Sequence, residues 1–342
     1  MNTISNIKLP HPFVYDKILA SAFSPAKPDE AKITDLIRLS LQDRIGIDEK
    51  LRKHMGKWKL KPTQKRKIAR LFGWDDFASF GAGKRKPLFS DNAANNTAWF
   101  AHMVFLIQEF HKLSRARPIQ FYMLTLADVS WNFGDKYTTI DWYRIKKKAT
   151  RALETIDVEG VAVLEFQPMT NEHLGDEGRL MMPNVHAIIW RKDGSPFDHR
   201  KARKRLCSSF TAKGKAKSAF IKPVTELAGG LIGALMYLSK PISSGKCLVT
   251  HRDGTSQNVP SAKYFRNNQS LRIMEVLSHF KHSNLIFGRG EGTTIRQAAL
   301  KSVRNHQPKD WDEVENVPDL WKRARQTADK VDFMPVRILM KA

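Results

Sequence analysis

Three stretches of strand character, separated by helical segments, limit what this chain can fold into. "IQFYMLTLAD" (119–128), "GVAVLEFQP" (160–168) and "MMPNVHAIIW" (181–190) are short and rich in apolar and aromatic residues, as strands are. Helical patterns cover 97–115, 138–156 and 225–240, and a basic helix begins at 199. The interleaving predicts an α+β domain over 116–303, preceded by a mainly helical region, 1–115, and followed by a tail, 304–342.

Two further segments are less regular. The segment 241–262, "PISSGKCLVTHRDGTSQNVPSA", predicts a loop that could hold one short strand. The region 270–302 predicts helix with a glycine-rich turn, "FGRGEG". That turn could cradle a phosphate, but the Walker spacing is missing and a plain turn explains it better.

The charge of the chain points to a polyanionic partner. The 342 residues are 42% hydrophobic and 27% charged, as in a globular protein, yet the formal net charge is +24. Nucleic acid is the partner that such a surface favours over a membrane, because no basic amphipathic helix dominates and "LAGGLIGALMYL" is too short to span a bilayer. Two cysteines and a first segment without the features of a secretion signal predict a cytoplasmic protein.

Two basic runs are the predicted DNA-backbone contacts. Residues 53–70 contain eight Lys or Arg and no acid, and residues 200–222 contain nine and no acid, whereas a solvated helix face usually mixes signs. Such contacts fix position rather than sequence. The predicted DNA-binding residues are Lys57, Lys59, Lys61, Lys65, Arg66, Lys67, Arg200, Lys201, Arg203, Lys204 and Arg205.

The strand 181–190 carries one histidine beside an amide. Side chains alternate along a strand, so Asn184 and His186 share a face and can reach one ion. Taken alone, His186 fits a hydrogen-bonded structural histidine better than a ligand. On the strand 160–168, Glu165 lies on the face opposite Leu164, and a carboxylate there requires a cation or a donor. If the two strands are neighbours, Glu165 meets His186; otherwise it pairs with a Lys or Arg.

The helix 225–240 places a tyrosine and a lysine together. Its leucines form a buried stripe, and Tyr237 and Lys240 lie off it, three residues apart and adjacent on the surface. Gly233, one turn before Tyr237, leaves room for something flat or bulky. An ammonium favours a tyrosine anion and stabilises charge on an attacked phosphate. The alternative is an amphipathic surface tyrosine, with glycines that permit close helix packing.

In chain order, these segments resemble the motifs of the rolling-circle replication initiators of plasmids and phages, members of the HUH endonuclease superfamily. "FYMLTLAD" is similar to the first motif, with Leu126-Ala127 where a second threonine is expected. "MMPNVHAIIW" resembles the second, in which two histidines flank a hydrophobic residue, and "MYLSK" the third, a nucleophilic tyrosine followed three residues later by lysine. The resemblance covers about residues 119–300.

The resemblance implies a central antiparallel sheet with flanking helices, and DNA nicking as the activity. Carried over by position, His186 and Glu165 are metal ligands, Asn184 is a third, Tyr237 is the nucleophile and Lys240 is its electrostatic partner. The oxygen-rich set suits Mg²⁺ or Mn²⁺. The chain departs from the pattern at Asn184, which stands in the place of the first histidine; an amide oxygen is a neutral and weaker donor, so metal affinity and activity are in question.

The expected reaction is attack of Tyr237 on a phosphodiester that the metal polarises, leaving a 5′-phosphotyrosine link and a free 3′-hydroxyl that primes rolling-circle replication. One tyrosine in the helix predicts a single-tyrosine enzyme. A host helicase and polymerase are the expected partners beside the DNA origin. Three rivals remain: a transposase of the same superfamily, a basic DNA-binding protein with a decayed site, and an RNA-binding protein that uses "WKLK" (58–61) and aromatic strands as stacking platforms.

Overall fold

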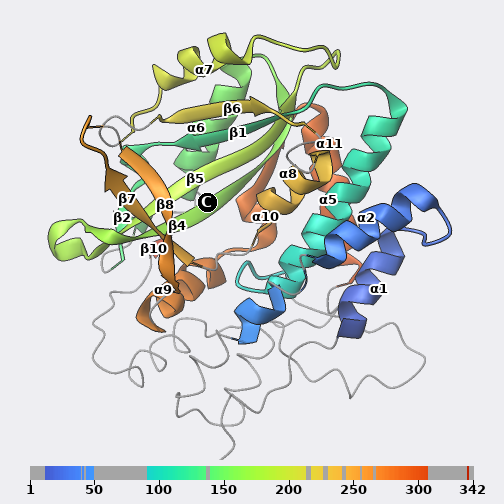
Figure 1. Ribbon diagram of the computed structural model, residues 1–342, viewed down its shortest axis with the longest axis horizontal. Helices are drawn as coiled ribbons and strands as arrows, with labels where there is room; N and C mark the ends of the chain where they lie inside the picture. The colour runs from blue at the N-terminus through green and yellow to red at the C-terminus, as the bar shows by residue number, and fades with distance from the viewer. Residues whose placement is uncertain are drawn as a thin grey trace, which may run out of the picture.

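The computed structural model describes residues 12–39, 41, 44–49, 91–135, 139–212, 217–225, 230–240, 244–254, 256–264, 267–306 and 337–338. Within these ranges it is an α+β fold with an open central sheet flanked by helices, as predicted (Figure 1). The predicted contacts Lys57, Lys59, Lys61, Lys65, Arg66 and Lys67, and the WKLK segment, lie outside the described residues. So does nearly all of the predicted tail.

The centre of the sheet is antiparallel. Its strand order is β6 (Ala219–Pro223), β1 (Tyr122–Ala127), β5 (Arg179–Trp190), β4 (Glu159–His173), β7 (Ser244–Thr250) and β8 (Ser256–Tyr264). Two short strands pair off this path: β2 (Phe133–Gly134) with β5, and β9 (Ile286–Arg289) with β4. A separate parallel pair joins β3 (Thr139–Ile140) and β10 (Arg337–Ile338). The two longest strands, β4 and β5, are therefore neighbours, which is the condition the site needs.

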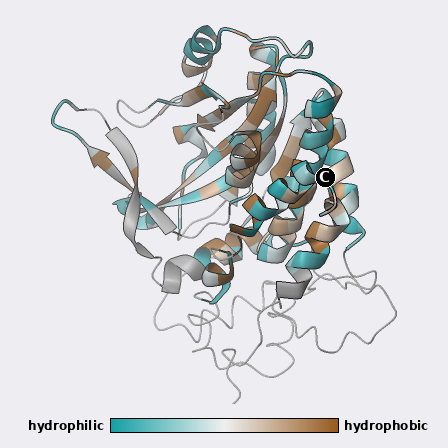
Figure 2. Ribbon diagram, turned by 45° about the vertical axis from the view of Figure 1, so that its right-hand side comes forward, coloured by the Kyte–Doolittle hydropathy of each residue, from teal (hydrophilic) through white to brown (hydrophobic). Residues whose placement is uncertain are grey.

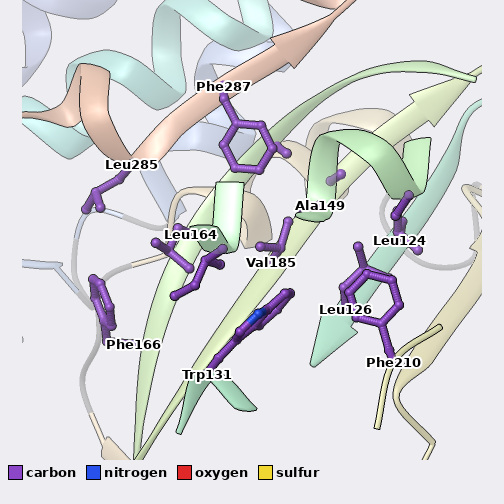
Figure 3. Packing of buried hydrophobic residues seen from close by; sticks show 14 of the residues in the cluster. Leu124, Leu126, Trp131, Ala149, Leu164, Phe166, Val185, Phe210, Leu285 and Phe287 are labelled. Carbon is purple, nitrogen blue, oxygen red and sulfur yellow. The ribbon is translucent and has the colours of Figure 1, made fainter. Parts of the chain in front are cut away.

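One face of the sheet carries a large hydrophobic core. Helices α6 (Trp142–Thr155), α7 (His199–Cys207) and α9 (Asn267–Ser278) cover it, and α10 (His282–Leu285) lies beside them. Leu124, Leu164, Phe166 and Val185 point into this layer (Figure 3). Burial of each side chain of this size contributes roughly 1.5–3 kcal/mol of transfer free energy. Because these residues must enter the core, the alternate residues of each strand point to the opposite face of the sheet.

The other face is covered by α5 (Asn96–Ala116), α8 (Gly230–Leu238) and α11 (Glu291–Arg304). Helices α1 (Pro12–Ala22) and α2 (Pro28–Leu39) pack in the same core, through residues such as Tyr15 and Ile37. The hydrophobic residues of the strands gather where the sheet meets its helices (Figure 2). Residue 115, the predicted end of the N-terminal region, lies in the last turn of α5, so the first helices and the sheet share one core.

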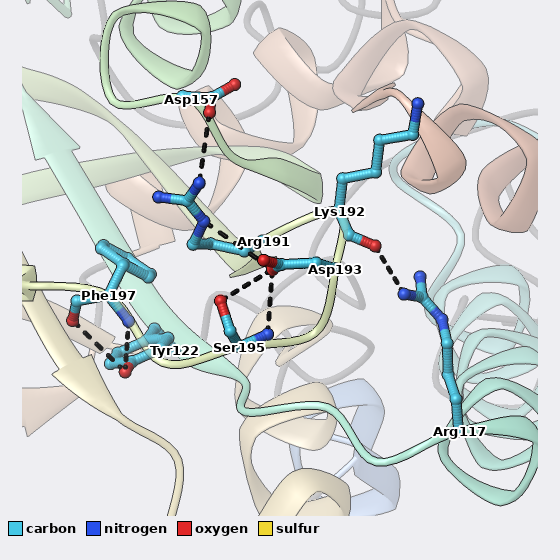
Figure 4. A network of polar contacts seen from close by, with 8 residues as sticks. All are labelled: Arg117, Tyr122, Asp157, Arg191, Lys192, Asp193, Ser195 and Phe197. Atoms are coloured by element: carbon cyan, nitrogen blue, oxygen red, sulfur yellow. Dashed lines mark hydrogen bonds and ion pairs between the residues drawn. The ribbon is translucent and has the colours of Figure 1, made fainter.

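The loop after β5 is fixed by polar contacts before α7 begins. Asp193 accepts from the Ser195 amide and hydroxyl at 3.0 and 2.8 Å, and Arg191 reaches Asp157 at 3.6 Å (Figure 4). The Phe197 amide donates to the Tyr122 hydroxyl at 3.3 Å, tying the loop to β1. Asp198 then caps α7 by accepting from the first amides of the helix. The basic helix therefore leaves the sheet in a defined direction.

The structure corrects two predictions. Within the predicted loop 241–262, the described residues form a β-hairpin of β7 and β8, whose polar sequence hides the strand pattern. The region 270–302, predicted as helix with a turn, contains the strand β9, since a run as short as "IFGR" has too few residues to show a period. The glycines of "FGRGEG" serve packing: a Cβ on Gly292 would lie 2.0 Å from the carbonyl oxygen of Gly160. This close approach of α11 to β4 explains the turn without a bound phosphate.

None of the helices in the described ranges has both the length and the apolar character that crossing a bilayer requires.

Candidate functional site

A polar row crosses the face of the sheet that α5 and α8 cover. In the strand register, His186 is opposite Thr125 of β1 on one side and Val163 of β4 on the other. Glu165 is opposite Asn184 in the next pair but one along β4 and β5. Cross-strand partners point to the same side, so Thr125, His186, Asn184 and Glu165 share one face. The strand alternation predicted this face correctly for His186, Asn184 and Glu165.

Hydrogen bonds join this row into a chain. The Thr125 hydroxyl lies 3.0 Å from His186 Nδ1, and His186 Nε2 lies 2.7 Å from Glu165 Oε2. Lys240 Nζ lies 3.5 Å from the other carboxylate oxygen, Glu165 Oε1. Because both ring nitrogens of His186 are engaged, the imidazole is held in one orientation.

Tyr237 reaches the same place from α8. Its ring meets His186 edge-on, with centroids 5.3 Å apart, and Lys240 Nζ lies 3.9 Å from the centroid of the tyrosine ring. Leu235 and Leu238 anchor the helix in the core, which leaves Tyr237 39% exposed. The phenol is therefore open to a substrate while its ring contacts the buried histidine.

A buried arginine fixes the end of this helix. Arg44 Nη2 donates to the Ser239 carbonyl at 2.8 Å, one residue before Lys240. The same guanidinium donates to Asn96 Oδ1 at 3.3 Å at the start of α5. The position of Tyr237 and Lys240 thus depends on a segment almost two hundred residues upstream.

The charges at the site support one another. Burial has the largest effect on the pKa of the Glu165 carboxyl and raises it, but the hydrogen bond and charge of His186, with Lys240 and Lys246, outweigh burial and lower the pKa to about 2. Burial lowers the pKa of the Lys240 ammonium, and the opposing influence of Glu165 and Tyr237 raises it above its ordinary value. Glu165 is thus an anion and Lys240 a cation at neutral pH, and the ammonium faces the phenol.

The donors fit a hard divalent cation in kind. His186 and Glu165 converge and Asn184 is the cross-strand partner of Glu165, which gives one nitrogen and two kinds of oxygen donor. Thr125 would accept from His186 Nδ1–H when Nε2 is turned to a metal, a usual arrangement for histidine ligands. In number the set is small: no three His, Cys, Asp or Glu side chains in the described ranges gather as a metal site. Mg²⁺ or Mn²⁺ therefore stays a prediction.

The structure brings four of the predicted residues into one cluster: Tyr237, Lys240, His186 and Glu165. The predicted basic residues of α7 lie apart from it, because the helix packs through Ala202 and Leu206 on the other face of the sheet. Arg200, Lys201, Lys204 and Arg205 are exposed there and Arg203 is half-buried. The helix lies against β6, the strand at the edge of the sheet, so its charges are near that edge.

Sequence reasoning missed three contributors. Thr125 was visible as the threonine of the first motif, but its contact with His186 required the β1–β5 register. Arg44 gave no local signal. Phe220 is an exposed aromatic residue on the five-residue strand β6. It lies at the end of a basic run, and the pattern there indicated contacts by charge rather than by an aromatic ring.

Comparison of the chain with protein-family models, with curated proteins and with solved structures gave no match. The resemblance to rolling-circle initiators therefore stays a prediction from the sequence motifs.

Proposed function

We propose that this chain nicks one strand of DNA through Tyr237 and initiates rolling-circle replication. The observation that carries the proposal is the meeting of an exposed phenol with an ammonium, an imidazole and a carboxylate. These groups come from one helix and two strands, on the face of the sheet that α8 covers. A structural tyrosine does not need this set. A nucleophile does, because a cation beside it favours the phenolate and the charge that develops on phosphorus.

The reaction exchanges one phosphodiester for another. The oxygen of Tyr237 bonds to phosphorus and loses its proton to solvent, the bond from phosphorus to O3′ breaks, and O3′ takes up a proton. The products are a 5′-phosphotyrosine and a free 3′-hydroxyl. Lys240 is placed to stabilise the phosphate oxygens, and the carboxylate of Glu165 orients both Lys240 and His186. A divalent cation, when bound by His186, Glu165 and Asn184, would supply Lewis-acid polarisation of the phosphate.

The test is formation of a covalent adduct. Wild-type protein is incubated with labelled single-stranded oligonucleotides from candidate origins and Mn²⁺, and the products are separated under denaturing conditions. We expect a protein–DNA band from wild type and none from Tyr237→Phe. Tyr143→Phe is the matched control, since Tyr143 on α6 is as exposed, at 41%, and should keep the band. A band that survives Tyr237→Phe would refute the proposed nucleophile.

A second function is favoured by one observation. Asn184 stands where the motif that the chain resembles has a histidine, and an amide oxygen is a neutral and weaker donor to a metal. We infer as the alternative a basic DNA-binding protein in which Glu165, His186 and Lys240 form a structural ion-pair cluster. It predicts binding to DNA without an adduct, whatever metal is added, and it leaves the Tyr237→Phe variant indistinguishable from wild type.

A further inference from the structure

A groove lies beside the tyrosine, between the edge of the sheet and α8. Its volume is about 350 Å³, and its lining includes Tyr237, Phe220, Lys222 and Gly233. This is the size of a small-ligand site rather than of a packing defect. Gly233 has no side chain to fill the space, so the groove is open along the helix face that carries Tyr237.

An exposed phenylalanine forms the far wall of the groove. Phe220 is 45% exposed on β6, although its neighbours along the strand, Ala219 and Ile221, are buried. The edge of a sheet is where an exposed apolar ring invites unwanted association. An aromatic ring that stays exposed there, next to a candidate nucleophile, indicates that a ligand packs against the face of the ring.

The strand register places this ring in line with the cluster. Phe220 is opposite Thr125, and Thr125 is opposite His186, so the three side chains form one row across β6, β1 and β5. Two strand spacings put the backbone of Phe220 roughly 10 Å from that of His186. Lys222 lies in the next row with the same orientation, opposite Met123. A flat group on Phe220 and a phosphate at Tyr237 can therefore belong to one extended chain.

The chemistry of the groove suits a nucleotide. Among the described residues that line it, Lys222 is the one charged side chain, and the rest are apolar, aromatic, glycine or threonine. An aromatic platform with a single ammonium and no carboxylate matches a base and its phosphate, because every base has a stacking face and every phosphate a negative charge. An acidic or apolar peptide would leave one of these two features unused.

We propose that the groove holds single-stranded DNA next to the scissile phosphate, with a base stacked on Phe220 and a backbone phosphate on Lys222. The inference rests on the proposed function for its substrate. The inference gives the DNA strand a direction on the protein. The DNA runs from Tyr237 across β1 towards the edge of the sheet at β6, near the exposed basic residues of α7. Phe220 is then a determinant of position on the strand, and it tolerates any base.

The test separates base stacking from phosphate attraction. The probes are fluorescein-labelled dT12 and a dodecamer of the same backbone with abasic sites, and the measurement is anisotropy at fixed salt. On dT12, we expect Phe220→Ala to weaken binding about 10-fold and Phe220→Trp to keep the wild-type affinity. On the abasic dodecamer, Phe220→Ala should have no effect. Lys222→Ala should weaken both probes and reduce the slope of log affinity against log salt by about 0.7.

The controls keep this inference distinct from the nicking proposal. Tyr143→Ala removes an equally exposed aromatic on α6 and should leave both affinities unchanged. Thermal unfolding of Phe220→Ala confirms that the exposed substitution folds. An adduct without a Phe220 effect on dT12 overturns the stacking subsite alone. A Phe220 effect that is equal on both probes also overturns it. A base-dependent effect without any adduct keeps the subsite and refutes the nicking reaction.

Discussion

His186 lies on β5 and His102 on α5, and both are almost wholly buried, at 4% and 1% exposure. His186 has a partner at each ring nitrogen, Thr125 and Glu165. Neither ring nitrogen of His102 has a hydrogen-bond partner among the described residues. Its ring instead lies beside that of His282, with centroids 4.6 Å apart. A carboxylate and an ammonium therefore lie at the first histidine, whereas the second has no acidic hydrogen-bond partner among the described residues.

The difference teaches that burial alone does not mark a functional histidine. Burial is the largest influence at His102 and lowers the pKa of its imidazole well below the ordinary value of 6.5, with His282 and Arg296 acting in the same direction. Burial also lowers the pKa of His282 to about 3. Both rings are therefore neutral at pH 7, and the His282 ring donates a hydrogen bond from Nδ1 to the Asp91 carbonyl. His186 differs from both, because its ring is hydrogen-bonded to the carboxylate of Glu165.

The largest expected effect concerns His102, whose ring nitrogens have no hydrogen-bond partner among the described residues. Below about pH 6.5, the unfolded chain protonates His102 while the folded chain does not, so the free energy of unfolding falls as pH falls. The loss is about 1.4 kcal/mol per pH unit for each such histidine, and it is absent above that window. His102→Phe should make the fall between pH 6.5 and 4.5 shallower by that amount. Urea denaturation at several pH values measures it, and parallel curves for wild type and variant would contradict it.

Removal of the partnered histidine should affect activity instead. We expect His186→Ala to reduce the rate of adduct formation on the order of 100-fold, since in the proposed reaction this ring lies beside the nucleophile Tyr237 and would face the phosphate. His102→Phe should keep the wild-type rate. Single-turnover assays of the two variants compare the histidines directly. Equal rates in both variants would remove the functional distinction between them.

The Glu165 carboxylate is what distinguishes the surroundings of His186 from those of His102. A substitution that keeps the shape of this side chain and removes its charge tests this. Glu165→Gln leaves Lys240 without its anion and should lower the free energy of unfolding at pH 7 by roughly 2 kcal/mol. The folded pKa of Glu165 is lowered, so wild type loses this contribution as pH falls from about 4.5 towards 2, and the variant has none to lose. Glu109→Gln breaks a surface pair with Lys112, and that control should change stability by less than about 0.5 kcal/mol.

The smallest expected effect comes from taking one partner from His186. Thr125→Val keeps the volume and removes the hydroxyl, which should cost about 1 kcal/mol of stability and slow adduct formation about fivefold. Thr155→Val, in which the lost hydroxyl bonds only an exposed helix carbonyl, serves as the control. An unchanged rate in Thr125→Val would show that Glu165 alone orients the ring.

Local patterns predicted much of this arrangement. The alternation in 160–168 and 181–190 placed Glu165, Asn184 and His186 on one face, because apolar residues at the alternate positions had to enter the core. Helical spacing placed Tyr237 beside Lys240. The meeting of helix and strands is tertiary information, and the sequence alone supported it through a family resemblance.

The remainder could not be predicted, for physical reasons. The hairpin β7–β8 and the strands β6 and β9 are short or polar, so their pairing with neighbours, rather than their own pattern, makes them strands. Arg44 and Ser239 are almost two hundred residues apart, and a side chain to carbonyl contact at that separation leaves no periodic trace. Asn184 stands where the motif that the chain resembles has a histidine, and the ion it would help to hold remains a prediction.

The bond from Arg44 to the Ser239 carbonyl has a practical consequence for anyone who shortens this protein. A fragment that starts at residue 116 would keep every proposed reacting group. It would lose Arg44, whose guanidinium bonds the backbone just after α8. It would also lose the α5 surface that packs in one core with Val163 and Trp190. Loss of activity in such a fragment would not separate a displaced nucleophile from the loss of the predicted DNA contacts at 57–67. Point substitutions in the 342-residue chain therefore dissect the site more cleanly.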